Sequence, residues 1–150
     1  MRWLTALLVL VAAPMSAHAE IEPKYYAEMQ AGAPEAVTVK VTEVDTSVCV
    51  LWCSKQSVTA KAVVTAVERS ANGLKVGDAI TIHYTHLIPS GGWAGPRPIP
   101  VLKEGETTVA FLRLNKRMGY HPAARGYSFE RVAAERVARE VPAPEPAERP

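Results

Sequence analysis

The chain has 150 residues, a formal net charge of +2, and 48% hydrophobic and 21% charged residues. This length suits one domain with a real hydrophobic core. The near-neutral charge argues against nucleic acid as a partner. After the N-terminal segment no apolar stretch is long enough for a transmembrane helix, so we expect no stable membrane anchor.

The N-terminal segment has the three parts of a secretory signal peptide. Arg2 supplies the positive charge, the apolar run from Trp3 to Pro14 is too short to span a bilayer, and Ala17-His18-Ala19 is a small-residue cleavage site. The sequence therefore predicts a signal peptide over residues 1–19, with cleavage between Ala19 and Glu20. The mature chain would be periplasmic or secreted.

Apolar periodicity predicts one mainly β domain over residues 36–132. A lead-in over residues 20–35 contains a short helix from Pro23 to Gln30. In the first strand, Val37, Val39 and Val41 alternate with polar residues, and the slip before Val44 indicates a bulge. Four strands are expected at residues 35–48, 58–67, 79–87 and 107–114, with a fifth at 127–132. The second strand is apolar on both sides, which is consistent with cover on both faces.

Beyond the domain, residues 133–141 have the pattern of a short C-terminal helix. Residues 142–150 are rich in proline, which predicts an extended, disordered tail. The fold class expected from these elements is all-β: a small antiparallel five-stranded barrel resembling an OB-fold, followed by the short helix.

Two segments of the chain share one pattern before a strand. Leu74-Lys75-Val76-Gly77-Asp78 precedes the strand at 79–87, and Leu102-Lys103-Glu104-Gly105-Glu106 precedes the strand at 107–114. Glycine permits the positive φ of a tight turn, the leucine can fill the end of a barrel, and the acid keeps the turn solvated. The pattern fits either a reused turn or an internal repeat.

Three segments carry a family resemblance. They are the alanine–valine strand Thr59 to Val67, the glycine-led strand Gly77 to Ile82, and the closing element Gly105 to Leu112. Together they resemble the netrin/TIMP-like branch of OB-folds over about residues 37–114. Members of that family carry several disulfides and an N-terminal cysteine that some inhibitors place on a protease's metal. Here the mature chain would begin at Glu20, so the resemblance implies a fold and not protease inhibition.

The two cysteines, Cys49 and Cys53, have two interpretations. In an oxidising compartment a disulfide is expected. Residues four apart on a strand are about 13 Å apart, too far for a bridge, so residues 49–53 would form a turn that displays Trp52. Alternatively, Cys-x-x-x-Cys with His86 would form a copper site, because thiolates suit Cu(I). His83 and His86 are three apart on a strand and point to opposite faces, so one at most could join the cysteines. A thiol redox role is a third interpretation.

A long loop from Pro89 to Pro100 is the second candidate site. It carries Trp93 and Arg97, residue types that are frequent in binding hot spots. The loop would either contact a partner through these two side chains or cover the open end of the barrel. A basic stretch from Arg113 to Arg125 would be either a solvated hairpin tip or a contact for an anionic surface.

The sequence contains no recognisable catalytic set. It lacks the nucleophile elbow G-x-S-x-G, the zinc motif H-E-x-x-H and a glycine-rich phosphate loop. We therefore expect a non-enzymatic binding module that contacts an envelope or extracellular protein through Trp52, Trp93 and Arg97, without a cofactor. The alternative is a periplasmic copper-binding protein that uses Cys49, Cys53 and His86.

Overall fold

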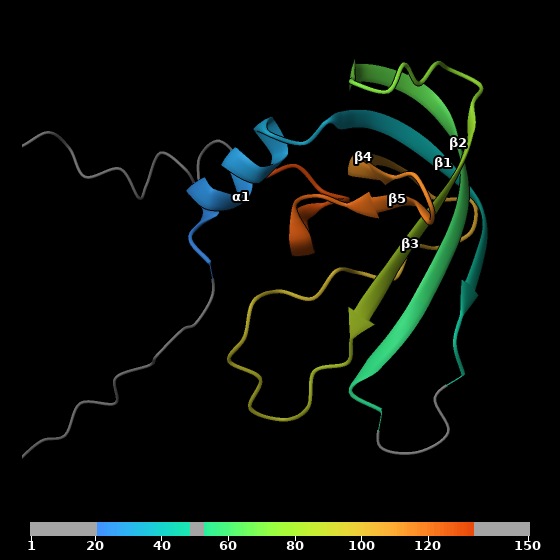
Figure 1. Ribbon diagram of the computed structural model, residues 1–150. Helices are drawn as coiled ribbons and strands as arrows, with labels where there is room; N and C mark the ends of the chain where they lie inside the picture. Colours follow the sequence, from blue (N-terminus) through green and yellow to red (C-terminus); the bar gives the residue numbers. More distant parts are fainter. Residues whose placement is uncertain (1–20, 49–52, 134–150) are drawn as a thin grey trace, which may run out of the picture.

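A computed structural model describes residues 21–48 and 53–133 (Figure 1). Its elements in chain order are α1 Pro23–Ala31, β1 Glu35–Thr46, β2 Lys55–Ser70, β3 Ala79–Leu87, β4 Thr107–Asn115, β5 Gly119–Pro122 and the 3₁₀ helix η1 Arg125–Tyr127. The expected signal peptide and tail lie outside the described residues, as does the expected C-terminal helix apart from Ala133. Within the described ranges, no helix is long and apolar enough to cross a membrane.

The five strands close into a barrel in the order β1-β2-β3-β5-β4. Strand β4 returns to lie beside β1, so the order β4-β1-β2-β3 is that of a Greek key. All neighbours are antiparallel except β3 and β5, which are parallel and pair at Ile82 and Tyr120. The expectation of a purely antiparallel barrel is therefore wrong. Directions cannot alternate around a closed ring with an odd number of strands, so at least one pair has to be parallel.

The predicted bulge in the first strand is confirmed. Strand β1 shifts register against β2 at three places, one of them between Val41 and Glu43. Bulges bend a strand and increase its twist, which lets β1 pair with β2 along its length and with β4 along its first half. The expected cover on both faces of β2 is wrong. Only Val58, Ala60, Ala62 and Val64 are buried there, because β2 is a barrel wall with solvent outside.

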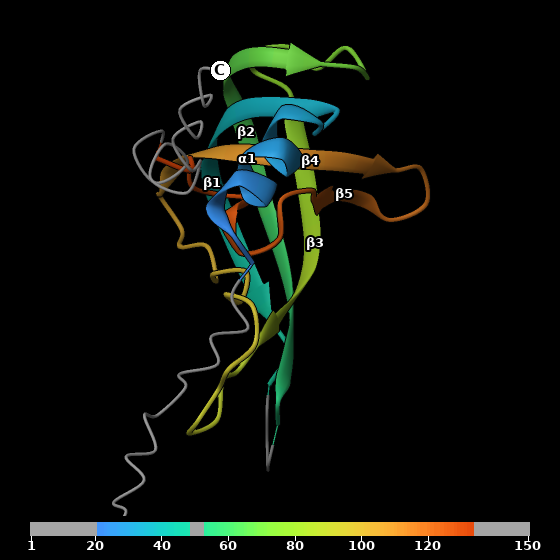
Figure 2. The same cartoon turned by 90° about the vertical axis from the view of Figure 1, so that its left-hand side faces the viewer.

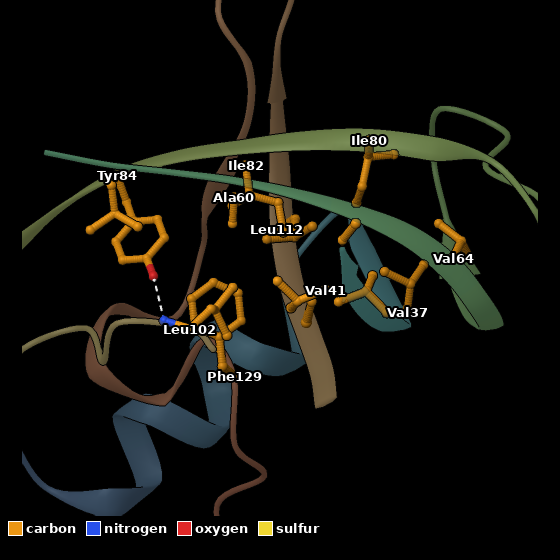
Figure 3. Packing of buried hydrophobic residues seen from close by; sticks show 14 residues of the cluster. Val37, Val41, Ala60, Val64, Ile80, Ile82, Tyr84, Leu102, Leu112 and Phe129 are labelled. Atoms are coloured by element: carbon orange, nitrogen blue, oxygen red, sulfur yellow. Dashed lines mark hydrogen bonds between the residues drawn. The ribbon is translucent and has the colours of Figure 1, made fainter. Parts of the chain in front are cut away.

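The barrel interior is filled by aliphatic side chains that alternate along β1 to β4. Val37 and Val41 point into the same core as Ile80, Ile82 and Leu112 (Figure 3), and Val39 belongs to the same cluster. Leu102 and Phe129 close one end, where the Tyr84 ring lies 5.6 Å from that of Phe129. The Tyr84 hydroxyl accepts a hydrogen bond from the Leu102 amide at 3.0 Å, drawn as a dashed line in Figure 3.

The two Leu-Lys-x-Gly-acid turns have one geometry. Gly77 and Gly105 have φ of 96° and 81°. In each turn the acid's side chain accepts a hydrogen bond from the lysine amide, at 2.8 Å for Asp78 and 3.0 Å for Glu106. Both leucines contact the core: Leu102 is buried within it, and Leu74 is partly buried and packs against it. The sequence suggested only that the acid keeps the turn solvated. In the structure its carboxylate also closes the turn by a hydrogen bond.

The predicted fifth strand at 127–132 is wrong, because β5 is Gly119–Pro122. The later segment forms a tight turn instead. The Ser128 hydroxyl accepts a hydrogen bond from the Ala124 amide and donates one to the Arg125 carbonyl. The Ser128 carbonyl accepts a hydrogen bond from the Phe111 amide, which holds this turn against β4.

Helix α1 confirms the predicted helix and lies beside the segment after β5 (Figure 2). The Gln30 amide nitrogen donates hydrogen bonds to the carbonyls of Tyr127 and Glu130, at 2.8 and 2.6 Å. Phe111 and Val109 belong to a second apolar cluster on this side, together with Ala33, Ala36 and Ala124. The helix thereby fixes the η1 turn in place.

Candidate functional site

The long loop between β3 and β4 is attached to the barrel at its second half. The Tyr84 hydroxyl donates a hydrogen bond of 2.9 Å to the Pro100 carbonyl, and His86 Nδ1 lies 2.7 Å from the Ile99 carbonyl oxygen. Burial raises the pKa of Tyr84 above its ordinary value. His86 therefore already has a hydrogen-bond partner within the loop.

Beside these attachments lies a cavity of about 290 Å³, here called the loop pocket. Mainly apolar side chains and two arginines line it: Thr85, Leu87, Trp93, Pro96, Arg97, Pro98, Ile99 and Arg125. Trp93 is 45% exposed, and its indole N–H donates a hydrogen bond of 3.2 Å to the Pro96 carbonyl. A Cβ at position 95 would lie 2.5 Å from the Trp93 ring, so the ring lies directly against Gly95 and leaves no room for a side chain there.

The two arginines of the loop pocket differ in their partners. Arg97 forms an ion pair of 2.7 Å with Glu130, and its guanidinium lies 4.6 Å from the centre of the Tyr127 ring. Burial lowers the pKa of Arg97, but the hydrogen bonds and charge interactions with Glu130 and Tyr127 together outweigh this effect, so the pKa lies above its usual value. Arg97 thus joins the loop to the C-terminal segment.

Arg125 ends the basic stretch that begins at Arg113, for which the sequence left two interpretations open, a solvated hairpin tip and a contact for an anionic surface. Its side chain is exposed, and no ion pair in the described part of the chain involves it. Its φ is 48°, the only positive value among the described residues other than glycine. A side chain in the left-handed region costs about 1–2 kcal/mol, and such strain is concentrated at binding sites. The next residue, Gly126, lies so close to Arg97 that a Cβ would overlap its carbonyl.

A second cavity, of about 310 Å³, lies on the outer side of β2, β3 and β5. We call Thr59, His83, Met118 and His121, which help to line it, the histidine cluster. The His83 and His121 ring centres are 6.3 Å apart, and His83 Nδ1 lies 3.1 Å from Thr59 Oγ1. His121 Nε2 is buried and has no hydrogen-bond partner among the described residues.

The remaining predicted site residues are only partly described. Cys49 and Trp52 lie outside the described residues, and with them the predicted disulfide and copper site. Cys53 is half-buried just before β2, and the described residues include no free cysteine. His83 and His86 have different partners, Thr59 and Ile99. No group of three or more His, Cys, Asp or Glu side chains suited to a metal occurs in residues 21–48 and 53–133.

Comparison with known proteins found no matching family model, no matching curated protein and no matching solved structure.

Proposed function

We propose that the chain is a non-enzymatic binding module built on an OB-like barrel and exported to the periplasm or the medium. The OB-like assignment is supported by the five-stranded closed barrel with Greek-key order. Export is supported by the signal-peptide pattern of residues 1–19 alone. The resemblance to netrin/TIMP-like domains is part of the same proposal.

The observation that carries the binding role is the loop pocket. It combines an apolar lining, the half-exposed ring of Trp93 and the charge of Arg125, which forms no ion pair within residues 21–48 and 53–133. Ligand sites are mostly apolar hollows with a few polar groups that set orientation. The partner expected from this chemistry is an extended protein segment that inserts an apolar side chain and places an adjacent carboxylate on Arg125.

The loop pocket is also held in shape before any partner binds. Tyr84, His86 and the Arg97–Glu130 ion pair attach the loop to the barrel and to the C-terminal segment. A site that is already ordered loses less conformational entropy on binding. Arg97 therefore acts as a positioning residue in this proposal, and Trp93 and Arg125 contact the partner.

We extend the proposal to the Cys49–Cys53 disulfide. Support comes from the absence of a free cysteine in the described residues and from the expected oxidising compartment. The Ile88 amide donates a hydrogen bond of 3.0 Å to the Ser54 carbonyl, so the bridge would stiffen a segment attached to the start of the loop. Intact mass after thiol alkylation tests it: an unalkylated chain two hydrogens light supports the bridge, and two alkylated thiols contradict it.

Selection of displayed random peptides on the immobilised mature chain tests the binding role. We expect enriched peptides to share an apolar residue next to Asp or Glu. Arg125→Gly should weaken the best peptide by about 10-fold or more, because a charged hydrogen bond contributes about 1.5–3 kcal/mol. Trp93→Ala should weaken it by at least about fivefold.

The control variant is Arg117→Ala, which removes an exposed charge from the turn between β4 and β5. Arg125→Gly also removes the backbone strain at φ 48°, so we expect this variant to fold at least as stably as the natural chain. Equal affinity of the selected peptides for the natural chain, Trp93→Ala and Arg125→Gly would contradict the proposal. So would a selection without enrichment.

A further inference from the structure

We propose that His83, His121 and Met118 form a binding site for one copper(I) ion on the outer side of the barrel. The site is separate from the loop pocket and does not depend on the proposed binding function. It also differs from the copper site expected from the sequence, which uses Cys49, Cys53 and His86.

The distance between the two imidazoles fits a shared metal ion. With metal–nitrogen bonds of about 2.0–2.1 Å, two imidazoles on one ion have ring centres about 5–6.5 Å apart, depending on the bond angle. The His83 and His121 ring centres are 6.3 Å apart. This value lies near the upper limit of the range, which corresponds to a wide nitrogen–metal–nitrogen angle with the two nitrogens on nearly opposite sides of the ion.

His121 supplies the strongest single indication of a ligand. Its Nε2 is buried, and no group among the described residues forms a hydrogen bond with it. A buried polar atom without a partner costs about 1–3 kcal/mol, so proteins seldom keep one without a role. A neutral imidazole nitrogen with a free lone pair is a metal ligand.

Thr59 prepares His83 for the same task. His83 Nδ1 lies 3.1 Å from Thr59 Oγ1, and when this nitrogen carries the proton, Nε2 keeps its lone pair. Ligating histidines usually donate their second ring N–H in this way. A Cβ at Gly119 would lie 3.8 Å from His83 Nε2, so this nitrogen is close to β5, the strand that carries His121.

The thioether of Met118 determines which metal ion the site would favour. Met118 lies in the turn before β5, lines the same cavity and is 57% exposed. A thioether is a soft ligand that favours Cu(I), whereas imidazole alone would serve zinc or nickel equally well. Two imidazoles and one thioether therefore favour copper(I) as the occupant over the harder divalent ions.

Anaerobic titration of the mature chain with copper(I) against a coloured copper(I) chelator tests the proposal. We expect one ion per chain, and at least 10-fold weaker binding in each of His83→Gln, His121→Gln and Met118→Leu. Met118→Leu replaces an exposed side chain and should keep the fold, so it tests the site even if a histidine variant unfolds. His86→Gln is the matched control and should bind copper(I) as the natural chain does.

Thr59 gives a test of positioning. We expect Thr59→Val to weaken copper(I) binding about 10–100-fold. The separate variant Thr59→Ser should bind copper(I) as the natural chain does, because serine keeps the hydroxyl that orients His83. Unchanged affinity in Met118→Leu and His121→Gln would overturn the proposal. Loss of the bound ion in Cys49→Ser would also overturn it, in favour of the cysteine site. Tighter binding of zinc than of copper(I) would likewise overturn the proposal, because the thioether of Met118 is the ligand that favours copper(I).

Discussion

The Tyr84 hydroxyl oxygen connects the loop between β3 and β4 to the barrel by two hydrogen bonds. It donates a hydrogen bond to the Pro100 carbonyl at 2.9 Å and accepts one from the Leu102 amide at 3.0 Å. Tyr84→Phe removes that oxygen and keeps the ring that contacts Phe129. We expect the variant to fold with a lower free energy of unfolding and a less ordered loop.

The size of the loss follows from the atoms left without partners. The Leu102 amide lies in a buried hydrogen bond, and a buried donor without a partner costs about 1–3 kcal/mol. The Pro100 carbonyl is half-buried and can be hydrated in part. A loss of about 2 kcal/mol lowers the Tm of a domain of this size by roughly 8 °C.

Chemical and thermal denaturation of both chains measure this loss, and hydrogen exchange measures the order of the loop. Tyr25→Phe is the matched control, since Tyr25 is 46% exposed. We expect faster exchange of the Leu102 amide in Tyr84→Phe. A Tm equal to that of the Tyr25→Phe control, with unchanged exchange at Leu102, would refute the reasoning.

The same hydroxyl predicts a loss of stability at alkaline pH. Burial raises the pKa of Tyr84 above the ordinary value of 10.0, so the unfolded chain loses this proton at a lower pH than the folded chain. The stabilisation is complete below pH 10 and decreases as the pH rises above it. This decrease should be smaller in Tyr84→Phe. Burial also raises the pKa of Tyr120, which leaves a residual dependence in the variant.

Three further substitutions test the barrel by denaturation. Gly119→Ala should cost more than about 2 kcal/mol, because φ is 85° and its Cβ would lie 2.9 Å from the Thr81 carbonyl oxygen; a cost no larger than that of Gly73→Ala, which has a similar φ and open space, would contradict this. Leu112→Ala empties a fully buried position and should cost about 2–5 kcal/mol; a loss under about 1 kcal/mol would place Leu112 outside the core. Asp78→Ala removes the hydrogen bond from the Lys75 amide and should cost about 1 kcal/mol, whereas Asp78→Asn should retain most of the stability; equal losses would assign the effect to charge.

Strands with a regular pattern were predictable from the sequence. Alternating apolar residues and flanking turn residues predicted strands at 79–87 and 107–114. The structure has β3 at Ala79–Leu87 and β4 at Thr107–Asn115, which differ from the prediction by one residue at most. Strand β5 was missed because Gly119–Pro122 is too short to show a period. Residues 127–132, which were predicted as the fifth strand, contain aromatic and aliphatic residues typical of a strand. Phe129 is buried in the core, but it reaches the core from a turn.

The candidate sites were less predictable, because their key features arise from backbone geometry. Trp93 and Arg97 were selected by residue type, and the structure places both at the loop pocket, with Arg97 paired to Glu130. Nothing in the residue type of Arg125 indicates a φ of 48°. The closeness of His83 and His121 depends on the pairing of β3 with β5, which no local pattern reveals.

The parallel contact between β3 and β5 explains why the histidine cluster is where it is. A ring of five strands needs one parallel pair, and this pair meets at a single position, Ile82 and Tyr120. Gly119 lets β5 approach the Thr81 carbonyl there, since a side chain would not fit. Ile82 is buried in the core, so the next residue on β3, His83, lies on the outer side, as His121 does next to Tyr120 on β5. The contact that closes the barrel thus brings the two imidazoles together where few backbone hydrogen bonds join the strands.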